Sequence, residues 1–370
     1  MQGEHNVAWF DILALISISY LIVLFTVPLV RKYALQLKLG DKPNGRKIHA
    51  SAIPHLGGIG ITCGILGSVA LYELLFGKSL FLFGRMIPGV SLIIVLGLLD
   101  DLINLRALQK LSVQILAGII LVVSGFELSI GVHAIDAVPF AAMLVTLFYL
   151  VAVSNAINLI DGHDGLAAGL CVISSAALAI SAAILQVPDA LVLSLAVGAA
   201  CLAFLVFNFP PAKIFMGDTG SMLLGISLGL VVCSLTMVKP SLYMLVATCF
   251  ILGVPILDTL LAITRRLALR APVFGADNLH MHHIIFSFGM TERQTLLVLY
   301  CIHAVFCIIG VLAMQKFLFS VILGVVIMAV LFSLFIRWMV ASTRTTEKMG
   351  ETVVTKLPHD TFPSLDKIAK

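Results

Sequence analysis

Charged residues are scarce in this sequence of 370 residues. Lys, Arg, Asp and Glu make up 11% of the chain, whereas hydrophobic residues make up 60%. One soluble core could not bury so much apolar surface, so an ordinary soluble globular protein is excluded. The seven cysteines stand singly in apolar runs with no CxxC pair, which argues against a disulfide framework or a thiolate metal site. No basic, aromatic-rich surface indicates nucleic-acid binding.

The apolar residues form long continuous runs. A spanning helix needs about 20 apolar residues, whereas a transmembrane barrel would show short alternating segments. We therefore predict an all-α, polytopic membrane protein with about eleven transmembrane helices. Residues 1–340 would form a single transmembrane domain, and residues 341–370 a polar, mobile cytoplasmic tail. The predicted spans are residues 9–30, 57–77, 86–103, 111–126, 139–157, 166–186, 189–208, 221–237, 241–263, 295–315 and 317–340.

The positions of Lys and Arg orient the chain. If the N-terminus lies outside, the inner segments carry 19 of the 23 Lys and Arg residues, and the outer segments carry four. Positive residues favour the cytoplasmic side of a membrane. We therefore predict an N-terminus outside and a C-terminus in the cytoplasm.

Four polar stretches lie at the ends of predicted spans, and the predicted topology places all four on the cytoplasmic face. A charged residue at a helix centre in a bilayer costs about 2.5 kcal/mol or more, so acids at span boundaries require an explanation. Because the spans rest on hydropathy and on Lys and Arg alone, this coincidence predicts one cytoplasmic site. The stretches are GLLDDLINL with Asp100 and Asp101, NAINLIDGHDG with Asn155, Asn158, Asp161 and Asp164, FMGDTGS with Asp218, and DNLHMHH with His280, His282 and His283.

The spacing of these residues indicates their chemistry. Asn155, Asn158 and Asp161 are three residues apart, which places them on one helical face. Carboxylates and carboxamides without cysteine suit Mg²⁺ or Mn²⁺ better than zinc. In FMGDTGS, free backbone N–H groups at the start of a helix would also favour a phosphate.

Each stretch also has a structural interpretation. The DD pair could be a solvated helix end, although the helix dipole disfavours negative charge there. In GDTGS, Thr219 or Ser221 could simply cap the next helix. The histidines resemble a zinc site in spacing, but Asp277 is the only carboxylate near them in the sequence. Asp258 could be functional or could form a structural pair with a basic neighbour.

Taken in order, the motifs resemble those of the polyprenyl-phosphate N-acetylhexosamine-1-phosphate transferases of glycosyltransferase family 4. Within this family they resemble the bacterial undecaprenyl-phosphate N-acetylglucosamine-1-phosphate transferases more than the MurNAc-pentapeptide transferases, which typically carry three consecutive histidines. The motifs, all within residues 31–294, are DKPNGRKIHASAIPHLGG, LLDDL, NAINLIDGHDGL, FMGDTGS, VPILDT and HMHH.

The resemblance implies an enzyme that transfers GlcNAc-1-phosphate from UDP-GlcNAc to undecaprenyl phosphate and releases UMP. The product would start a cell-envelope polysaccharide at the cytoplasmic face of a bacterial inner membrane. The implied cofactor is Mg²⁺, with Mn²⁺ as the alternative, and the oligomeric state stays open, a homodimer included. Asn278 stands where this type often has an arginine, so Arg266 or Arg270 would have to replace that contact.

The resemblance also implies a role for each site residue. It implies Asp100 and Asp101 as catalytic acids beside the phosphates; Asp218, Asn158 and Asp161 as metal ligands; Asp164, Gly162 and Phe215 at the nucleotide; His280, His282, His283, Arg265 and Arg266 at sugar and phosphate groups; and Asp41, Arg46 and Lys47 as contacts of the lipid phosphate or its loop.

Other functions make different demands on the sequence. An ion-coupled transporter would place its acids near the bilayer midplane, along a path to both faces. An intramembrane metalloprotease would need a HExxH-like pair, which the sequence lacks. A transferase for MurNAc-pentapeptide or another UDP-N-acetylhexosamine stays open, as does a covalent route in which a carboxylate attacks first.

Overall fold

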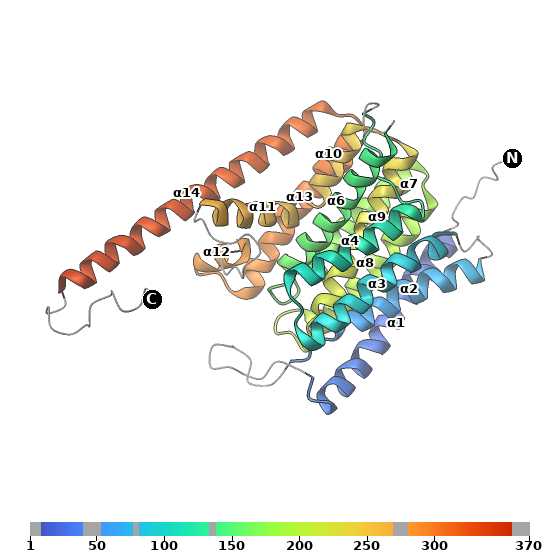
Figure 1. Ribbon diagram of the computed structural model, residues 1–370, viewed down its shortest axis with the longest axis horizontal. Coiled ribbons are helices and arrows are strands. Elements are labelled where there is room, and N and C mark those ends of the chain that lie inside the picture. The colour runs from blue at the N-terminus through green and yellow to red at the C-terminus, as the bar shows by residue number, and fades with distance from the viewer. Residues whose placement is uncertain (1–8, 40–52, 77–80, 133–137, 269–279, 357–370) are drawn as a thin grey trace. The chain divides into compact units, whose positions relative to one another are not determined.

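A computed structural model describes residues 9–39, 53–76, 81–132, 138–268 and 280–356 of the chain, with side chains described as far as Arg337. Every regular element within these ranges is a helix, which confirms the predicted all-α class (Figure 1). The helices are α1 (Trp9–Gln36), α2 (Gly57–Leu75), α3 (Phe81–Ile103), α4 (Ala107–Val123), α6 (Pro139–Ile160), α7 (Leu166–Leu185), α8 (Pro188–Asn208), α9 (Gly217–Val238), α10 (Leu242–Ile251), α11 (Gly253–Ala268), α12 (Met281–Ser287), α13 (Glu292–Met314) and α14 (Leu318–Lys356).

The helices confirm a polytopic membrane protein. Within the described ranges, nine helices are long and apolar enough to span a membrane, and the bent pair α10–α11 raises this number to ten. The remaining predicted span corresponds to α4, which is apolar but has only 17 residues. Helix α14 continues beyond the predicted span to Lys356. The orientation of the termini and the extent of the transmembrane domain stay predictions.

The chain forms two compact units, Met1–Gly324 and Val325–Lys370, and all site residues discussed below lie in the first. Helix α9 is the most buried candidate span: 83% of its 18-residue apolar stretch is buried inside the protein, compared with 22% of the corresponding stretch of α1. Helices α2, α3, α6 and α8 pack against it. The first turn of α9, which carries Asp218, is therefore held within the bundle.

Two glycines allow neighbouring backbones to touch this first turn. A Cβ added at Gly97 of α3 would lie 2.3 Å from the Cα of Thr219, and one at Gly58 of α2 would lie 2.2 Å from the amide nitrogen of Gly220. Any larger side chain at either position would overlap backbone atoms, which cannot move aside as a flexible side chain could. The backbones of α2 and α3 thus fix the place where α9 begins.

The predicted span 241–263 is broken into α10 and α11, which meet at an angle of 83°. Pro255 explains the break, because it has no N–H to donate to the carbonyl of Ile251, four residues earlier. Two side chains from other helices use that carbonyl instead. The hydroxyl of Ser174 on α7 donates to it at 2.8 Å, and the thiol of Cys307 on α13 lies 3.4 Å away. The bundle therefore satisfies the carbonyl that the proline leaves free.

Candidate active site

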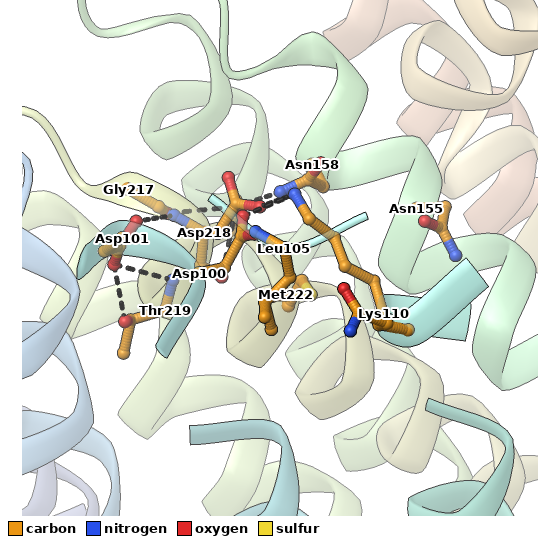
Figure 2. A network of polar contacts seen from close by, with 12 residues as sticks. Asp100, Asp101, Leu105, Lys110, Asn155, Asn158, Gly217, Asp218, Thr219 and Met222 are labelled. Atoms are coloured by element: carbon orange, nitrogen blue, oxygen red, sulfur yellow. Dashed lines mark hydrogen bonds and ion pairs between the residues drawn. The ribbon is translucent and has the colours of Figure 1, made fainter. Parts of the chain in front are cut away.

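Acids from two helices meet where α3 ends and α9 begins (Figure 2). Lys110 on the first turn of α4 forms ion pairs with both Asp100 and Asp218, and its Nζ lies 2.6 Å from Oδ2 of Asp218. Asp100 is buried, and its Oδ1 accepts a hydrogen bond from the amide of Leu105 at 2.6 Å. One ammonium group therefore joins two carboxylates that are far apart in the sequence.

Asp101 contacts the start of α9 through both carboxylate oxygens. Oδ1 accepts a hydrogen bond from the amide of Asp218 at 2.7 Å, and Oδ2 accepts from the amide of Thr219 at 3.2 Å and from its hydroxyl at 2.6 Å. Two amides that were expected to be free for a phosphate are thus occupied by this acid. The alternative that Thr219 or Ser221 caps the helix is wrong, because α9 begins at Gly217, before both residues.

Asn158 lies beside Asp218, as the metal prediction requires. Its amide hydrogen-bonds the carboxylate of Asp218 and also donates to the hydroxyl of Ser221 at 2.9 Å. Asn155, one turn earlier on α6, donates to the side-chain oxygen of Gln114 on α4 at 2.9 Å. The two asparagines therefore connect α6 to α9 and to α4. Asn155 serves as a structural link between helices.

Asp161 follows directly after α6 and faces other acids. Burial raises the pKa of the Asp161 carboxyl well above its usual value, and the negative charges of Asp218, Asp101 and Asp164 raise it further. Such crowding of carboxylates disfavours the ionised form unless a cation is near. Asp161 would therefore be ionised only when a cation lies close to it.

The loop after Asp161 is anchored to the segment that precedes α9. Oδ2 of Asp164 accepts a hydrogen bond from the amide of Ala212 at 2.8 Å. The side chain of Asn208 accepts from the amide of Gly165 and donates to the carbonyl of Ile214, each at 2.9 Å. Asp164, predicted at the nucleotide, therefore also holds this loop in place.

Phe215 precedes the GDTGS turn, and its ring stacks on His55 with ring centroids 5.2 Å apart. Its backbone pairs with the segment before α2: the amide of Phe215 donates to the carbonyl of Pro54 at 2.8 Å, and the amide of Gly57 donates to the carbonyl of Phe215 at 2.9 Å. The predicted nucleotide residue is thus held next to the site by backbone pairing.

Asp258 on α11 is paired with the HMHH segment. Its Oδ2 lies 2.7 Å from Nδ1 of His280, and its Oδ1 accepts a hydrogen bond from the amide of Met281 at 2.7 Å. Of the two interpretations of Asp258, the structure supports a pair with a basic neighbour, which orients His280. Arg265 and Arg266 on the same helix are buried.

His282 lies in a cluster of imidazole rings. It stacks on His163 with centroids 5.4 Å apart, and a Cβ added at Gly162 would lie 3.6 Å from its ring. Burial lowers the pKa of His282 to about 2, and the neighbouring His283, His163 and His280 add to the shift. Burial also lowers the pKa of His283. Among the residues that the structure describes, neither nitrogen of His282 has a hydrogen-bond partner, and both are buried, so the neutral ring keeps its donor and its acceptor for a ligand.

Some predicted residues lie outside the described part of the chain. These are Asp41, Arg46 and Lys47 of the first inner loop, together with Arg270, Asp277 and Asn278 before the histidines. Their implied roles stay predictions.

Sequence reasoning does not single out Lys110, Gln114 or His163. Lys110 enters the sequence prediction only as one of the positive charges that orient the chain. A lysine in the first turn of an apolar helix, in the turn that follows an acidic span end, is the signal that could have found it. Gln114 carries a similar signal, because a buried amide inside an apolar helix needs a partner.

The site contains oxygen donors suited to a hard cation. Among the residues that the structure describes, no group of three or more His, Cys, Asp or Glu side chains is arranged to hold a metal ion. Mg²⁺ does not need such a group, because it is usually bound by one or two carboxylates together with water and substrate phosphates. The carboxylate of Asp218 beside the amide of Asn158 fits that pattern. All seven cysteines are free.

Comparison with known proteins identifies the family. The family model described as glycosyl transferase family 4 matches residues 84–236, which include the acids of α3, the asparagines of α6 and Asp218. A Bacillus subtilis protein named "Probable undecaprenyl-phosphate N-acetylglucosaminyl 1-phosphate transferase" is 38% identical over 303 residues, covering 79% of this chain and 82% of its own. The chain belongs to glycosyl transferase family 4.

Two further relatives carry related names. The Escherichia coli K12 protein named undecaprenyl-phosphate alpha-N-acetylglucosaminyl 1-phosphate transferase is 31% identical over 81% of this chain and 83% of its own. The decaprenyl-phosphate N-acetylglucosaminephosphotransferase of Mycobacterium tuberculosis H37Rv is 34% identical over 78% of this chain and 79% of its own. As a member of glycosyl transferase family 4, the chain is a membrane-embedded transferase enzyme.

Proposed function

We propose that this family 4 enzyme transfers GlcNAc-1-phosphate from UDP-GlcNAc to undecaprenyl phosphate. The printed names of the relatives support both the sugar and the polyprenyl acceptor. The observation that carries the proposal is the Lys110 ammonium between Asp100 and Asp218, with Asn158 beside them. This arrangement combines a cation for phosphate with oxygen ligands for a metal. The proposed location is a bacterial inner membrane, with the site facing the cytoplasm.

In the proposed reaction, an oxygen of the lipid phosphate attacks the β-phosphorus of UDP-GlcNAc. A bond forms between them, the bond from the β-phosphorus to the bridging oxygen breaks, and UMP leaves with that oxygen. Because the second pKa of a phosphate monoester is about 6, the nucleophile is mostly a dianion at pH 7. A general base would therefore contribute only about 1 kcal/mol. The main barrier is electrostatic, because a dianion must approach a charged diphosphate.

Several residues of the chain would lower that electrostatic barrier. Lys110 would donate hydrogen bonds to phosphate oxygens, and Asp100, which pairs with it, would orient its ammonium. Asp218 and Asn158 would hold Mg²⁺, with Mn²⁺ as the alternative and Asp161 as a further ligand. When bound, the metal supplies positive charge that offsets the negative charge of the diphosphate. The neutral ring of His282, with His280 and His283, would bind sugar or phosphate oxygens.

The test is UMP release by the purified chain in the presence of undecaprenyl phosphate. UDP-GlcNAc, UDP-GalNAc and UDP-MurNAc-pentapeptide would be supplied separately, with and without EDTA. We expect UMP from UDP-GlcNAc only, loss of release with EDTA, and recovery with added Mg²⁺. No UMP from any donor would refute the transferase proposal, whereas UMP from another donor alone would refute the choice of sugar. Release that is unchanged by EDTA would refute the metal.

A further inference from the structure

The two adjacent acids at the end of α3 make different contacts. Asp100 pairs with Lys110, whereas both oxygens of Asp101 accept hydrogen bonds from the first turn of α9. Neighbouring residues on a helix point about 100° apart, so two successive side chains reach different partners. The two acids of the motif therefore have different structural roles: Asp100 pairs with a lysine, and Asp101 binds the start of α9.

Helix α9 lacks a cap of its own. Met216 occupies the N-cap position, and no side-chain hydrogen bond from that position reaches the helix. The first amides of a helix have no partner within the helix, and they usually bond to a Ser, Thr, Asp or Asn at the N-cap. Asp101 supplies the same acceptors from another helix. Its negative charge also interacts favourably with the positive end of the α9 dipole.

The conformation at Gly217 makes this external cap important. Gly217 has a φ of +71°, and a Cβ added there would lie 2.2 Å from the carbonyl oxygen of His55 and 2.5 Å from Oδ1 of Asp101. The chain thus turns sharply just before Asp218. The amide of Asp218 itself donates to Asp101 at 2.7 Å, so this contact fixes the backbone from which the Asp218 carboxylate extends toward Lys110.

We propose that Asp101 is a positioning residue: it caps α9 from α3 and so orients Asp218, while the substrates meet Asp100, Lys110 and Asp218. The proposal rests on the proposed transferase function for its activity measurement. It differs from the implied catalytic role of Asp101, because it predicts that the partner of Asp101, Thr219, matters as well.

Four variants separate capping from chemistry. Thr219→Val keeps the shape of the side chain but removes the hydroxyl that donates to Asp101, and Thr219→Ser keeps that hydroxyl. Thr236→Val makes the same change near the other end of α9, where, among the described residues, the buried hydroxyl bonds within its own helix alone, to the carbonyl of Cys233 at 3.0 Å. Asp101→Asn leaves one carbonyl oxygen as an acceptor.

We expect kcat/KM, measured as UMP release per folded protein, to fall about tenfold in Thr219→Val, because Asp101 loses one of its three hydrogen bonds to α9 and the Asp218 carboxylate is held less well in place. Thr219→Ser should restore most of the activity, and Thr236→Val should match the wild type. Asp101→Asn should fall further, and adding Thr219→Val to it should cause little additional loss. Because the Ser variant restores the hydroxyl alone, its rescue would not follow from a defect in packing.

Wild-type kcat/KM in Thr219→Val, or additive losses in the double variant, would overturn the proposal and return Asp101 to a direct role. If the wild-type chain released no UMP, the transferase function would fail, and melting temperatures would still test the cap. In that case we expect the losses of melting temperature in Asp101→Asn and Thr219→Val to be non-additive. Additive losses would overturn the cap even if Asp101→Asn alone proved too unstable for kinetics.

Discussion

Lys110→Met tests the centre of the proposed site. The substitution removes the ammonium that joins Asp100 and Asp218 but keeps an aliphatic side chain of similar length. Two unit charges about 4 Å apart interact by about 4 kcal/mol at an effective dielectric constant of about 20. The side chains of Lys110 and Asp218 are 28% and 26% exposed, so solvent screens part of this energy. We therefore expect a loss of about 1–2 kcal/mol in the free energy of unfolding.

The expected loss of activity is larger than the loss of stability. If Lys110 contacts phosphate oxygens as charge develops, its removal should cost about 3–4 kcal/mol of transition-state stabilisation. This corresponds to a fall of about 10²–10³-fold in kcat/KM. Lys110→Arg should recover part of the loss, because it keeps the charge with a different donor geometry.

The assay is UMP release from UDP-GlcNAc with undecaprenyl phosphate, measured on protein that elutes as a single folded species. Lys239→Met serves as the matched control, because Lys239 is exposed and directly follows the far end of α9. A kcat/KM in Lys110→Met within about threefold of the control would refute the reasoning, because removal of a cation that contacts the phosphate oxygens should lower kcat/KM far more.

Three further outcomes are expected. Asp218→Asn should lower kcat/KM at least about tenfold more than Asp100→Asn, because Asp218 alone would combine metal binding with the Lys110 contact; equal losses in parallel UMP assays would contradict this. Folding lowers the pKa of His282 from 6.5 to about 2, so the free energy of unfolding falls as the pH drops below 6.5. Between pH 7.5 and 5.5, thermal unfolding should show that the wild type loses about 1 kcal/mol more of this free energy than His282→Gln does. Equal losses in the two proteins would count against a neutral ring. Ser174→Ala should lower the free energy of unfolding by about 1 kcal/mol or more, because the carbonyl of Ile251 loses its closer donor and Nε2 of the buried His303 loses its 2.8 Å contact with the same hydroxyl. An unchanged melting temperature would show that neither contact stabilises the fold and that the thiol of Cys307 suffices for the carbonyl.

Hydropathy predicted the helices well because a span is a local property of the chain. Each predicted span has its helix, and the main difference is the break within 241–263. The hydropathy averaged over a span does not reveal such a break, because Gly253 and Pro255 stand among strongly apolar residues. Their effect depends on side chains of α7 and α13 that donate hydrogen bonds to the free carbonyl of Ile251, and these partners are remote in the sequence.

The site was predictable where its residues lie in motifs. The predicted topology placed the stretches that carry Asp218 and Asn158 on one face, and the family resemblance paired these two residues. The different contacts of Asp100 and Asp101 were not predictable, since they depend on which neighbour each side chain reaches in space. Lys110 lies outside the motifs that carried the resemblance, and only the packing of α4 against α3 and α6 brings it to the acids.

The contacts of Gly58 and Gly97 with the backbone of α9 have a consequence for interpreting variants. An alanine at either position would push the first turn of α9 away from α2 or α3 and carry the Asp218 carboxylate with it. The loss of activity would then resemble that of a catalytic variant, although no reactive group had been changed. A saturation screen scored on turnover alone would rank these two glycines among the catalytic residues, and only a parallel measurement of folding would reveal them as spacers.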